Sequence, residues 1–222
     1  MRLITISAKA RCGKDTAAQY LLSRYPRSTA YALAACFKES ISKHFSEYLT
    51  YDDVFGYGVD RNSYIIYIDR EEFIELTKKV FADFGYNLDE YSRECACIDI
   101  DWSVIDDNNG WTIRRMMQTI GTDIGVNQID TNIWLKEFEK ELFKIEPIYD
   151  TVVMTDCRQI HEIEFIRNRN GHVLHVLRDT GLDDDHITER GLPIEDEDFV
   201  IENDGTLDDF YRKLDQFIEQ LP

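Results

Sequence analysis

Long apolar runs and paired cysteines are both missing from this sequence. No segment is long and apolar enough to span a bilayer, and the first residues, MRLITIS, do not form the apolar stretch of a signal peptide. The five cysteines are an odd, scattered set, so they do not make a disulfide framework. Cys95 and Cys97 lie close together, but no second pair completes a zinc site. We therefore expect a reduced protein of the cytoplasm.

Positive charge is also scarce. The chain carries 25 lysines and arginines against 43 aspartates and glutamates, which gives a formal net charge of -18. A surface this acidic repels both the backbone of a nucleic acid and an anionic membrane, so we expect neither as a partner. A small anionic substrate needs a locally basic site. Clusters of arginine and lysine are therefore the first candidates for a binding site.

Apolar runs alternate with helical patterns along the chain. We predict strands at residues 3–7, 28–34, 149–156, 172–177 and 199–204, with a further short strand at 64–68. Most of these runs are apolar throughout, which indicates a parallel sheet covered on both faces. The sequence therefore predicts an α/β fold, with a parallel β-sheet flanked by helices, in one domain of residues 1–222.

Helices are predicted from apolar spacing and from capping residues. The first begins near Asp15 and is stopped by Pro26, and Thr206 caps the last. The other helices are expected at residues 69–84, 111–121, after a cap at Asp130, and at 159–170 with Gly171 as the C′ residue. Residues of about 47–110 are rich in tyrosine and acidic side chains, and we predict an inserted region there.

The stretch AKARCGKDT, residues 8–16, joins the first predicted strand to the first predicted helix. It follows the phosphate-binding pattern G-x-x-x-x-G-K-[ST] imperfectly, because Ala8 replaces the first glycine and Asp15 precedes the hydroxyl of Thr16. The alternative is a plain turn with an exposed lysine. Backbone N–H groups at a helix start bind phosphate, and the helix dipole favours anions. The position between strand and helix therefore favours a phosphate-binding loop.

The side chains of this loop suit a nucleotide. Lys14 can reach the β- and γ-phosphates, and the Thr16 hydroxyl can face Mg²⁺. Lys9 and Arg11 add positive charge in an otherwise acidic chain. These residue types at this spacing predict binding of a triphosphate with its metal ion.

Polar side chains also stand at a strand end and on one helix. Asp156 ends the most apolar strand and Arg158 follows it, at the edge of a parallel sheet where ligands bind. Asp156 could orient Mg²⁺ and Arg158 could bind phosphate, or the two could form a strand-end ion pair. Arg115 and Gln118 share a helix face and suit a phosphate or a base edge, although a solvated face is the alternative. Arg70 has the same two interpretations.

Several longer motifs resemble those of the bacteriophage-type deoxynucleoside monophosphate kinases. They are SAKARCGKDTAA, FKES, DRE at residues 69–71, WTIRRMMQTIGTD, DCRQIHE, HITERGLPI and NDGTL, and they span nearly the whole chain. The GKDT form, with Asp15 in this place, is usual for the family, whereas Ala8 departs from its common glycine. The resemblance implies a P-loop kinase fold with an inserted, mostly helical region that binds the monophosphate at about 47–110. It also implies a short lid at about 178–197.

The resemblance implies transfer of the γ-phosphoryl group of ATP, with Mg²⁺, to a deoxynucleoside monophosphate for DNA precursor synthesis. It implies three catalytic side chains, Lys14, Arg158 and Arg178. ATP would be bound by Lys9, Arg11, Cys12, Gly13, Lys14, Asp15, Thr16, Asn203 and Gly205, with the turn of Asn203 to Gly205 beside the adenine. The acceptor would be bound by Asp15, Lys38, Arg70, Trp111, Arg115, Gln118, Asp156, Arg158, His186, Thr188 and Glu189. Thr16 and Asp156 would serve the metal ion, and a homodimer is plausible by analogy.

Two other interpretations are compatible with the phosphate loop. One is a different small-molecule kinase, of the dephospho-coenzyme A or phosphomevalonate type, and the other is a non-catalytic nucleotide-binding module. An acceptor phosphate is already a nucleophile, so phosphoryl transfer depends mostly on positioning and charge neutralisation. An acidic protein with a few convergent basic residues suits that need. We also expect 2′-deoxy substrates to be preferred through an apolar or aromatic wall at C2′, for which the insertion supplies many candidates, including Tyr57, Tyr64, Tyr67 and Phe73.

Overall fold

The computed structural model describes all residues except 10, 89–98, 107–109, 180–191 and 222. The chain forms two compact units. The first unit consists of Met1–Leu33 and Phe138–Pro222, and the second of Ala34–Glu137. The inserted region expected at residues 47–110 lies within the second unit, which extends beyond it on both sides. Within the described residues, no helix combines the length and apolar character needed to cross a membrane.

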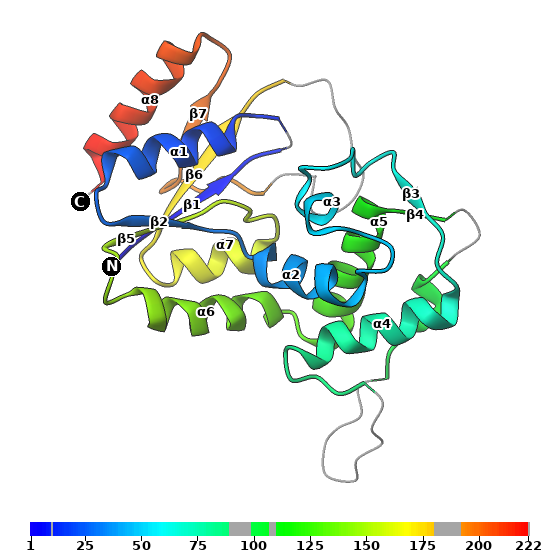
Figure 1. Ribbon diagram of the computed structural model, residues 1–222. Helices are drawn as coiled ribbons and strands as arrows, with labels where there is room; N and C mark the ends of the chain where they lie inside the picture. The colour runs from blue at the N-terminus through cyan, green and yellow to red at the C-terminus, as the bar shows by residue number, and fades with distance from the viewer. Residues whose placement is uncertain (10, 89–98, 107–109, 180–191, 222) are drawn as a thin grey trace. The chain divides into compact units, whose positions relative to one another are not determined.

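The first unit is built on a five-stranded sheet (Figure 1). Its strands are β1 (Arg2–Ser7), β2 (Ser28–Tyr31), β5 (Thr151–Met154), β6 (His172–Leu177) and β7 (Phe199–Glu202). They lie in the order β2-β5-β1-β6-β7, and every neighbouring pair is parallel. The predicted parallel sheet is therefore confirmed. All five strands present their carboxyl ends at the same edge, where ligands of such sheets bind.

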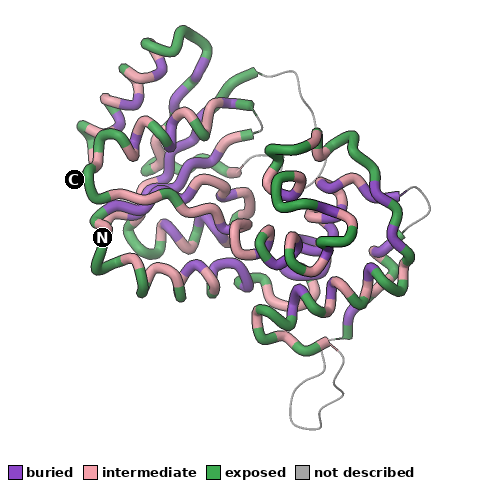
Figure 2. The backbone as a smooth tube through the Cα atoms, in the orientation of Figure 1, coloured by how far each residue is buried: buried purple, intermediate pink, exposed green. Residues whose placement is uncertain are grey.

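Helices cover both faces of this sheet. α1 (Lys14–Arg24) and α8 (Leu207–Gln220) lie on one face, and α7 (Ile160–Arg167) lies on the other (Figure 1). The core beneath α1 and α8 contains side chains from both helices and from the strands, including Leu21, Phe210, Leu214 and Phe217. Figure 2 shows the buried residues concentrated along the strands and on the inner sides of these helices.

The closing helix begins as the sequence predicts. Thr206 is the N-cap of α8, and its hydroxyl accepts from the backbone N–H of Asp209. The Asp209 carboxylate in turn accepts from the backbone N–H of Thr206, which completes a capping box. These bonds and the neighbouring Arg212 lower the pKa of Asp209 to about 2. Residues only three apart make this start, so the local sequence determines it.

The end of α7 differs from the prediction in one respect. Asn170, not Gly171, adopts the left-handed conformation, with φ of 53°. The N–H of Gly171 donates to the carbonyl of Ile166, and the N–H of Asn170 donates to that of Arg167, which is a Schellman pattern with Asn170 at C′. A Cβ on Gly171 would lie 2.6 Å from Cγ2 of Ile166 and 3.2 Å from Cβ of Leu3. Glycine is therefore needed here for close packing against the helix and β1.

The second unit is mostly helical. Its elements are α2 (Ala34–His44), α3 (Tyr51–Phe55), β3 (Ile65–Ile66), α4 (Arg70–Ala82), a 3-10 turn at Trp102–Val104, β4 (Trp111–Thr112), α5 (Ile113–Gln118), a π-helix over Thr119–Ile129 and the start of α6 (Ile133–Ile145). Stacked and edge-on aromatic rings form its core, among them Phe45, Phe73, Phe81, Trp111 and Trp134. The predicted helix of residues 69–84 is confirmed as α4, capped by the Asp69 carboxylate.

The predicted helix at residues 111–121 is wrong at both ends. Trp111 and Thr112 are extended and pair antiparallel with β3, because the Trp111 ring stacks on Phe73 and Thr112 caps α5. Beyond α5 the chain continues as a π-helix to Ile129. The π-helix packs closely against Trp134, because a Cβ on Gly125 would lie 3.2 Å from the Trp134 ring.

Candidate functional site

The loop between β1 and α1 has the backbone of a phosphate-binding loop. Arg11 and Gly13 adopt left-handed conformations, with φ of 64° and 103°. Gly13 immediately precedes α1, and among the described residues no side chain caps this helix start. The first N–H groups of a helix lack partners within it and carry the positive end of the helix dipole. The helix start is therefore open to an anion.

Several charged residues lie in the loop and in the first turn of α1. Nζ of Lys14 lies 2.5 Å from Oδ1 of Asp15, and the two side chains are 23% and 78% exposed. The lysine is thus held at the loop by an exposed carboxylate that an incoming phosphate can replace. Thr16 is half-buried in the first turn of α1, and Lys9 and Arg11 are exposed on the loop.

Asn203 joins the end of β7 to the loop. Its side-chain Nδ2 donates to the Cys12 carbonyl at 2.9 Å, and the Cys12 thiol donates to the Arg178 carbonyl at 3.5 Å. The structure thus brings three predicted residues together from the ends of β1, β6 and β7. Gly205 is exposed and directly precedes the N-cap of α8.

The turn between β5 and α7 contains a buried acid, Glu162, that is not among the residues predicted from the sequence. Oε2 of Glu162 accepts from the backbone N–H groups of Arg158 at 2.7 Å and Gln159 at 3.0 Å. Glu162 is only 5% exposed. Burial raises the pKa of Glu162 to about 7, and the nearby Asp156 charge acts in the same direction. The spacing Q-x-x-E of a capping box was the signal that could have found it.

Asp156 also has a structural partner. Its Oδ1 accepts from the backbone N–H of Leu33 at 2.6 Å, so the carboxylate ties the end of β5 to the segment that follows β2. Arg158 lies two residues further on, and its backbone is fixed by Glu162. Both predicted residues therefore stand at the carboxyl edge of the sheet on a hydrogen-bonded turn.

In the second unit, two predicted arginines bind the same segment of chain. Arg70 donates from Nη2 to the Trp102 carbonyl at 2.8 Å and from Nε to the Ile105 carbonyl at 3.3 Å. Arg115 donates from Nη1 to the Gly110 carbonyl at 3.0 Å and from Nη2 to the Asp106 carbonyl at 2.8 Å. The structure thus brings both guanidinium groups to backbone carbonyls of residues 102, 105, 106 and 110. Lys38 lies elsewhere in this unit, with Nζ 5.4 Å from the centre of the Phe55 ring.

Trp111 and Gln118 each carry a buried side-chain N–H group. The Trp111 ring is fully buried, 4.3 Å from Phe73, with the Arg115 guanidinium 4.4 Å from its centre. Among the described residues, Nε1 of Trp111 and Nε2 of Gln118 are buried without a hydrogen-bond partner. Buried donors of this kind are uncommon and call for an acceptor from a ligand or a water.

The four aromatic residues named as candidates for excluding the 2′-hydroxyl lie in different environments. Phe73 is fully buried, so its ring forms core and offers no surface to a ligand. Tyr57, Tyr64 and Tyr67 are 77%, 42% and 75% exposed. The tyrosines therefore remain the candidates.

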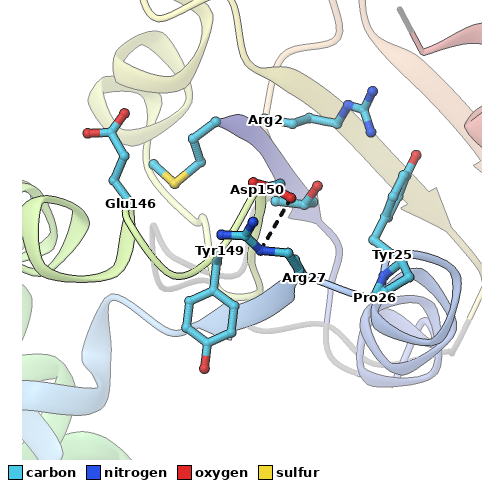
Figure 3. A pocket seen from close by; sticks show the side chains of 9 residues that line it. Arg2, Tyr25, Pro26, Arg27, Glu146, Tyr149 and Asp150 are labelled. Carbon is cyan, nitrogen blue, oxygen red and sulfur yellow. Dashed lines mark ion pairs between the residues drawn. The ribbon is translucent and has the colours of Figure 1, made fainter.

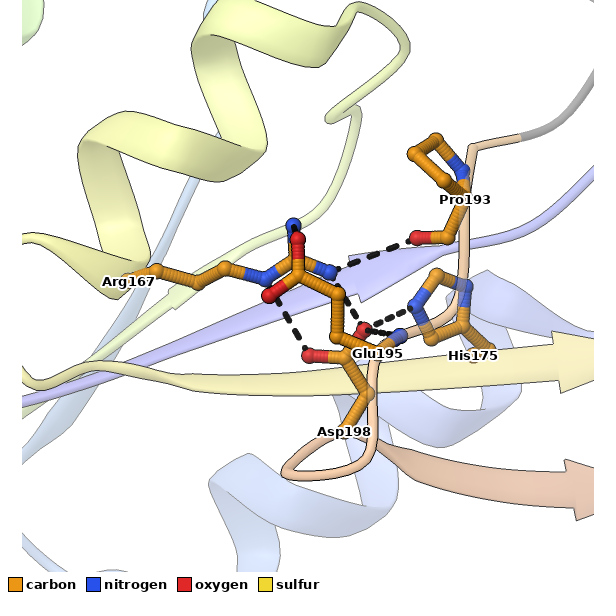
Figure 4. A network of polar contacts seen from close by, with 5 residues as sticks. All are labelled: Arg167, His175, Pro193, Glu195 and Asp198. Atoms are coloured by element: carbon orange, nitrogen blue, oxygen red, sulfur yellow. Dashed lines mark hydrogen bonds and ion pairs between the residues drawn. The ribbon is translucent and has the colours of Figure 1, made fainter.

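His186, Thr188 and Glu189 lie outside the described residues, as does most of the expected lid. A buried ionic network lies where the chain returns to the sheet after that segment (Figure 4). The Asp198 carboxylate accepts from Arg167, from Nε2 of His175 at 3.0 Å and from the Glu195 N–H at 2.9 Å. Burial alone would raise the pKa of Asp198, but these bonds hold it below its usual value. This network fixes the start of β7.

A recess of about 370 Å³ lies at the other edge of the sheet (Figure 3). It is lined by Met1, Arg2, Tyr25, Pro26, Arg27, Glu146, Tyr149, Asp150 and Thr151, at the amino ends of β1, β2 and β5. The Arg27 guanidinium donates to the Pro147 and Ile148 carbonyls and pairs with Asp150. None of the predicted site residues lines this recess, so it is distinct from the phosphate loop.

Comparison with known proteins gives matches over the whole length. A family model described as deoxynucleotide monophosphate kinase matches residues 2–214. A deoxynucleotide monophosphate kinase from Escherichia phage RB69 is 36% identical, covering 98% of this chain and 100% of the phage protein. One from Enterobacteria phage T4 is 32% identical and covers 100% of both. A solved dephospho-CoA kinase from Campylobacter jejuni covers 99% of this chain and 97% of its own at 15% identity, with a TM-score of 0.44, a likeness that implies no shared activity.

Proposed function

Because the chain belongs to the deoxynucleotide monophosphate kinase family and phosphorylates deoxynucleoside monophosphates, we propose that ATP with Mg²⁺ is its phosphoryl donor. The observation that supports this most directly is the start of α1 behind the left-handed Gly13, which no side chain of the described residues caps. Helix N–H groups and the dipole suit the phosphates of a nucleoside triphosphate. Lys14, Lys9 and Arg11 supply positive charge at the same loop.

We assign the metal ion to Thr16 and Asp156. Mg²⁺ in kinases is held by few protein oxygens together with substrate phosphates and water, so one hydroxyl and one carboxylate match this donor set. When bound, Mg²⁺ supplies charge neutralisation at the β- and γ-phosphates. Asp156 is held in place by the Leu33 N–H, which gives its carboxylate a fixed position before any ligand arrives.

The acceptor is assigned to side chains of the second unit. The guanidinium groups of Arg70 and Arg115 donate to backbone carbonyls in this structure. They suit the phosphate of a monophosphate better than a carbonyl, because hydrogen bonds between two charged groups are stronger than those to a neutral acceptor. Gln118 carries a buried donor that lacks a partner among the described residues, and an acceptor on a nucleobase edge would satisfy it. The Trp111 ring is fully buried, like that of Phe73, so we assign it the role of supporting the Arg115 guanidinium above it rather than of touching the base. Lys38 would add charge at the phosphate, and the exposed Tyr57, Tyr64 and Tyr67 would line the sugar.

The reaction needs little covalent chemistry from the protein. The acceptor phosphate oxygen attacks the γ-phosphorus of ATP, and the bond to the bridging oxygen of ADP breaks. We assign to Lys14, Arg158 and Arg178 the neutralisation of charge as the phosphoryl group moves. Glu162 fixes the backbone of Arg158 and so supports the position of its side chain.

The experiment that tests this function measures ADP formation from ATP and Mg²⁺ with different acceptors. Each dNMP, each NMP, dephospho-coenzyme A and phosphomevalonate are supplied separately. We expect turnover with at least one dNMP and a higher kcat/KM for it than for its ribose counterpart. Activity only with one of the last two compounds, or steady ADP release without any acceptor, would contradict the proposal. Equal kcat/KM for dGMP and GMP, or for dTMP and its ribose counterpart, would contradict only the exclusion of the 2′-hydroxyl.

A further inference from the structure

The phosphate-binding loop turns through two left-handed residues, Arg11 and Gly13, with φ of 64° and 103°. Glycine adopts this region readily, but the Cβ of Arg11 disfavours it, so contacts from outside the loop help to hold the turn. Between these two residues lies Cys12, which is 1% exposed and belongs to the core beneath α1 and α8.

The outside contact comes from Asn203, 191 residues away in the chain. Its Nδ2 donates to the Cys12 carbonyl at 2.9 Å, and its own N–H donates to the Leu177 carbonyl at 2.7 Å. The backbone of Asn203 is therefore bonded to the end of β6, and its side chain is bonded to the loop. Asn203 is only 9% exposed, so its side-chain amide lies in the protein interior.

The same amide also packs against Gly13. A Cβ built on Gly13 would lie 2.6 Å from Nδ2 of Asn203. The amide thus occupies the space that a side chain at position 13 would need, and it contacts the residue directly before α1. One asparagine therefore touches both residues that lead the chain into the helix start.

We propose that Asn203 is a positioning residue, which holds the phosphate-binding loop in its binding conformation through the Cys12 carbonyl and the face of Gly13. This inference rests on the proposed binding of ATP phosphates at the loop. It differs from the role implied by the family resemblance, in which the turn from Asn203 to Gly205 lies beside the adenine. Loss of the amide leaves the Cys12 carbonyl buried without its donor and lowers the fraction of loops ready to bind, which lowers affinity by the same factor.

The two roles predict different results for a ligand without a base. A positioning residue supports the phosphates, so its loss weakens inorganic tripolyphosphate and ATP equally. A residue that touches adenine supports only the base, so its loss weakens ATP alone. Inorganic tripolyphosphate with Mg²⁺, used as a competitor of ATP, is therefore the probe.

The test compares the full-length wild type with Asn203→Ala and Asn203→Asp. Asn203→Asp keeps the size of the side chain, so it preserves the packing even where Asn203→Ala leaves a space that destabilises the fold. Asn168→Ala, the same truncation at an exposed position at the end of α7, is the matched control. For each protein, KM for ATP, KM for the dNMP, kcat and Ki for tripolyphosphate are measured well below its Tm.

We expect Asn203→Ala to raise KM for ATP and Ki for tripolyphosphate by the same factor, about tenfold. Asn203→Asp should raise both at least as much, because a carboxylate oxygen would face the Cys12 carbonyl and add negative charge beside the phosphates. KM for the dNMP should stay within about twofold, and Asn168→Ala should match the wild type.

Three outcomes would overturn the proposal. A raised KM for ATP with unchanged Ki for tripolyphosphate would show that Asn203 touches the base. Unchanged values in both Asn203 variants, with tripolyphosphate competing normally in the wild type, would remove the positioning role and leave the ATP site in place. Failure of tripolyphosphate to compete with ATP in the wild type would remove the ATP assignment of the loop and the positioning role with it.

Discussion

The buried Glu162 should make the stability of this kinase depend on pH in an identifiable way. The pKa of the Glu162 carboxyl rises from an ordinary 4.5 to about 7 in the folded chain, and burial is the largest cause. The folded state therefore holds a proton that the unfolded chain releases between these values. The contribution of Glu162 to the free energy of unfolding is fully present below pH 4.5 and is lost as the pH rises through 7.

The size of this effect follows from the difference in pKa. A difference of about 2.5 corresponds to about 3 kcal/mol in all, of which about 2.5 kcal/mol is lost between pH 5 and pH 8. Glu162→Gln removes the titrating proton but keeps an oxygen that can accept from the N–H groups of Arg158 and Gln159. Relative to wild type, the variant should therefore gain about 2.5 kcal/mol on going from pH 5 to pH 8.

Urea denaturation followed by circular dichroism at several pH values measures this difference. Titrating groups away from Glu162 have the same surroundings in both proteins, so their contributions cancel. Glu164→Gln, at an exposed position of the same helix, is the control and should show no such change with pH. If the free-energy difference between Glu162→Gln and wild type is the same at pH 5 and pH 8, the raised pKa of Glu162 is refuted.

The other predictions concern the two groups of site residues and the ionic network. Lys14→Ala should leave Tm unchanged and lower kcat by about 10²-fold or more, as measured by ADP formation, because its charge acts mainly on the moving phosphoryl group; near-normal kcat would remove the phosphate-loop assignment. Arg70→Ala and Arg115→Ala should raise KM for the dNMP and spare KM for ATP, and the reverse pattern would contradict our division of the site. Asp198→Asn should lower the free energy of unfolding by about 3 kcal/mol in urea, because Arg167 and the 2% exposed His175 lose their charged partner; a loss below about 1 kcal/mol would show that the network contributes little.

Features made by residues close together in the chain were predictable from the sequence. The apolar run of β1, the loop with Gly13 and the start of α1 follow one another within about twenty residues, and each depends on local propensity. The capping box of Thr206 and Asp209 needs only four residues. The parallel sheet was predictable too, because strands buried on both faces are apolar throughout.

Other features depend on packing between distant residues. Trp111 is extended rather than helical because its ring stacks on Phe73 and its backbone pairs with Ile66. Gly171 serves close packing against Leu3, whereas the left-handed turn belongs to Asn170. Local propensity is a weak guide at such positions, because tertiary contacts outweigh preferences of a few tenths of a kcal/mol per residue.

The sequence by itself determined which residue types this kinase brings to phosphate chemistry, because the motif of residues 8–16 and the arginines carry that information in their identity and spacing. Only the tertiary structure decided which hydrogen-bond partners fix these residues in place. The bond from Asn203 to Cys12 joins residues 191 positions apart in the chain. Arg70 bonds to Trp102, 32 residues away, and Arg115 bonds to Asp106, 9 residues away. Hydrogen bonds are short-ranged and directional, so such partners are chosen by the way the chain folds back on itself, which no local pattern of residues records.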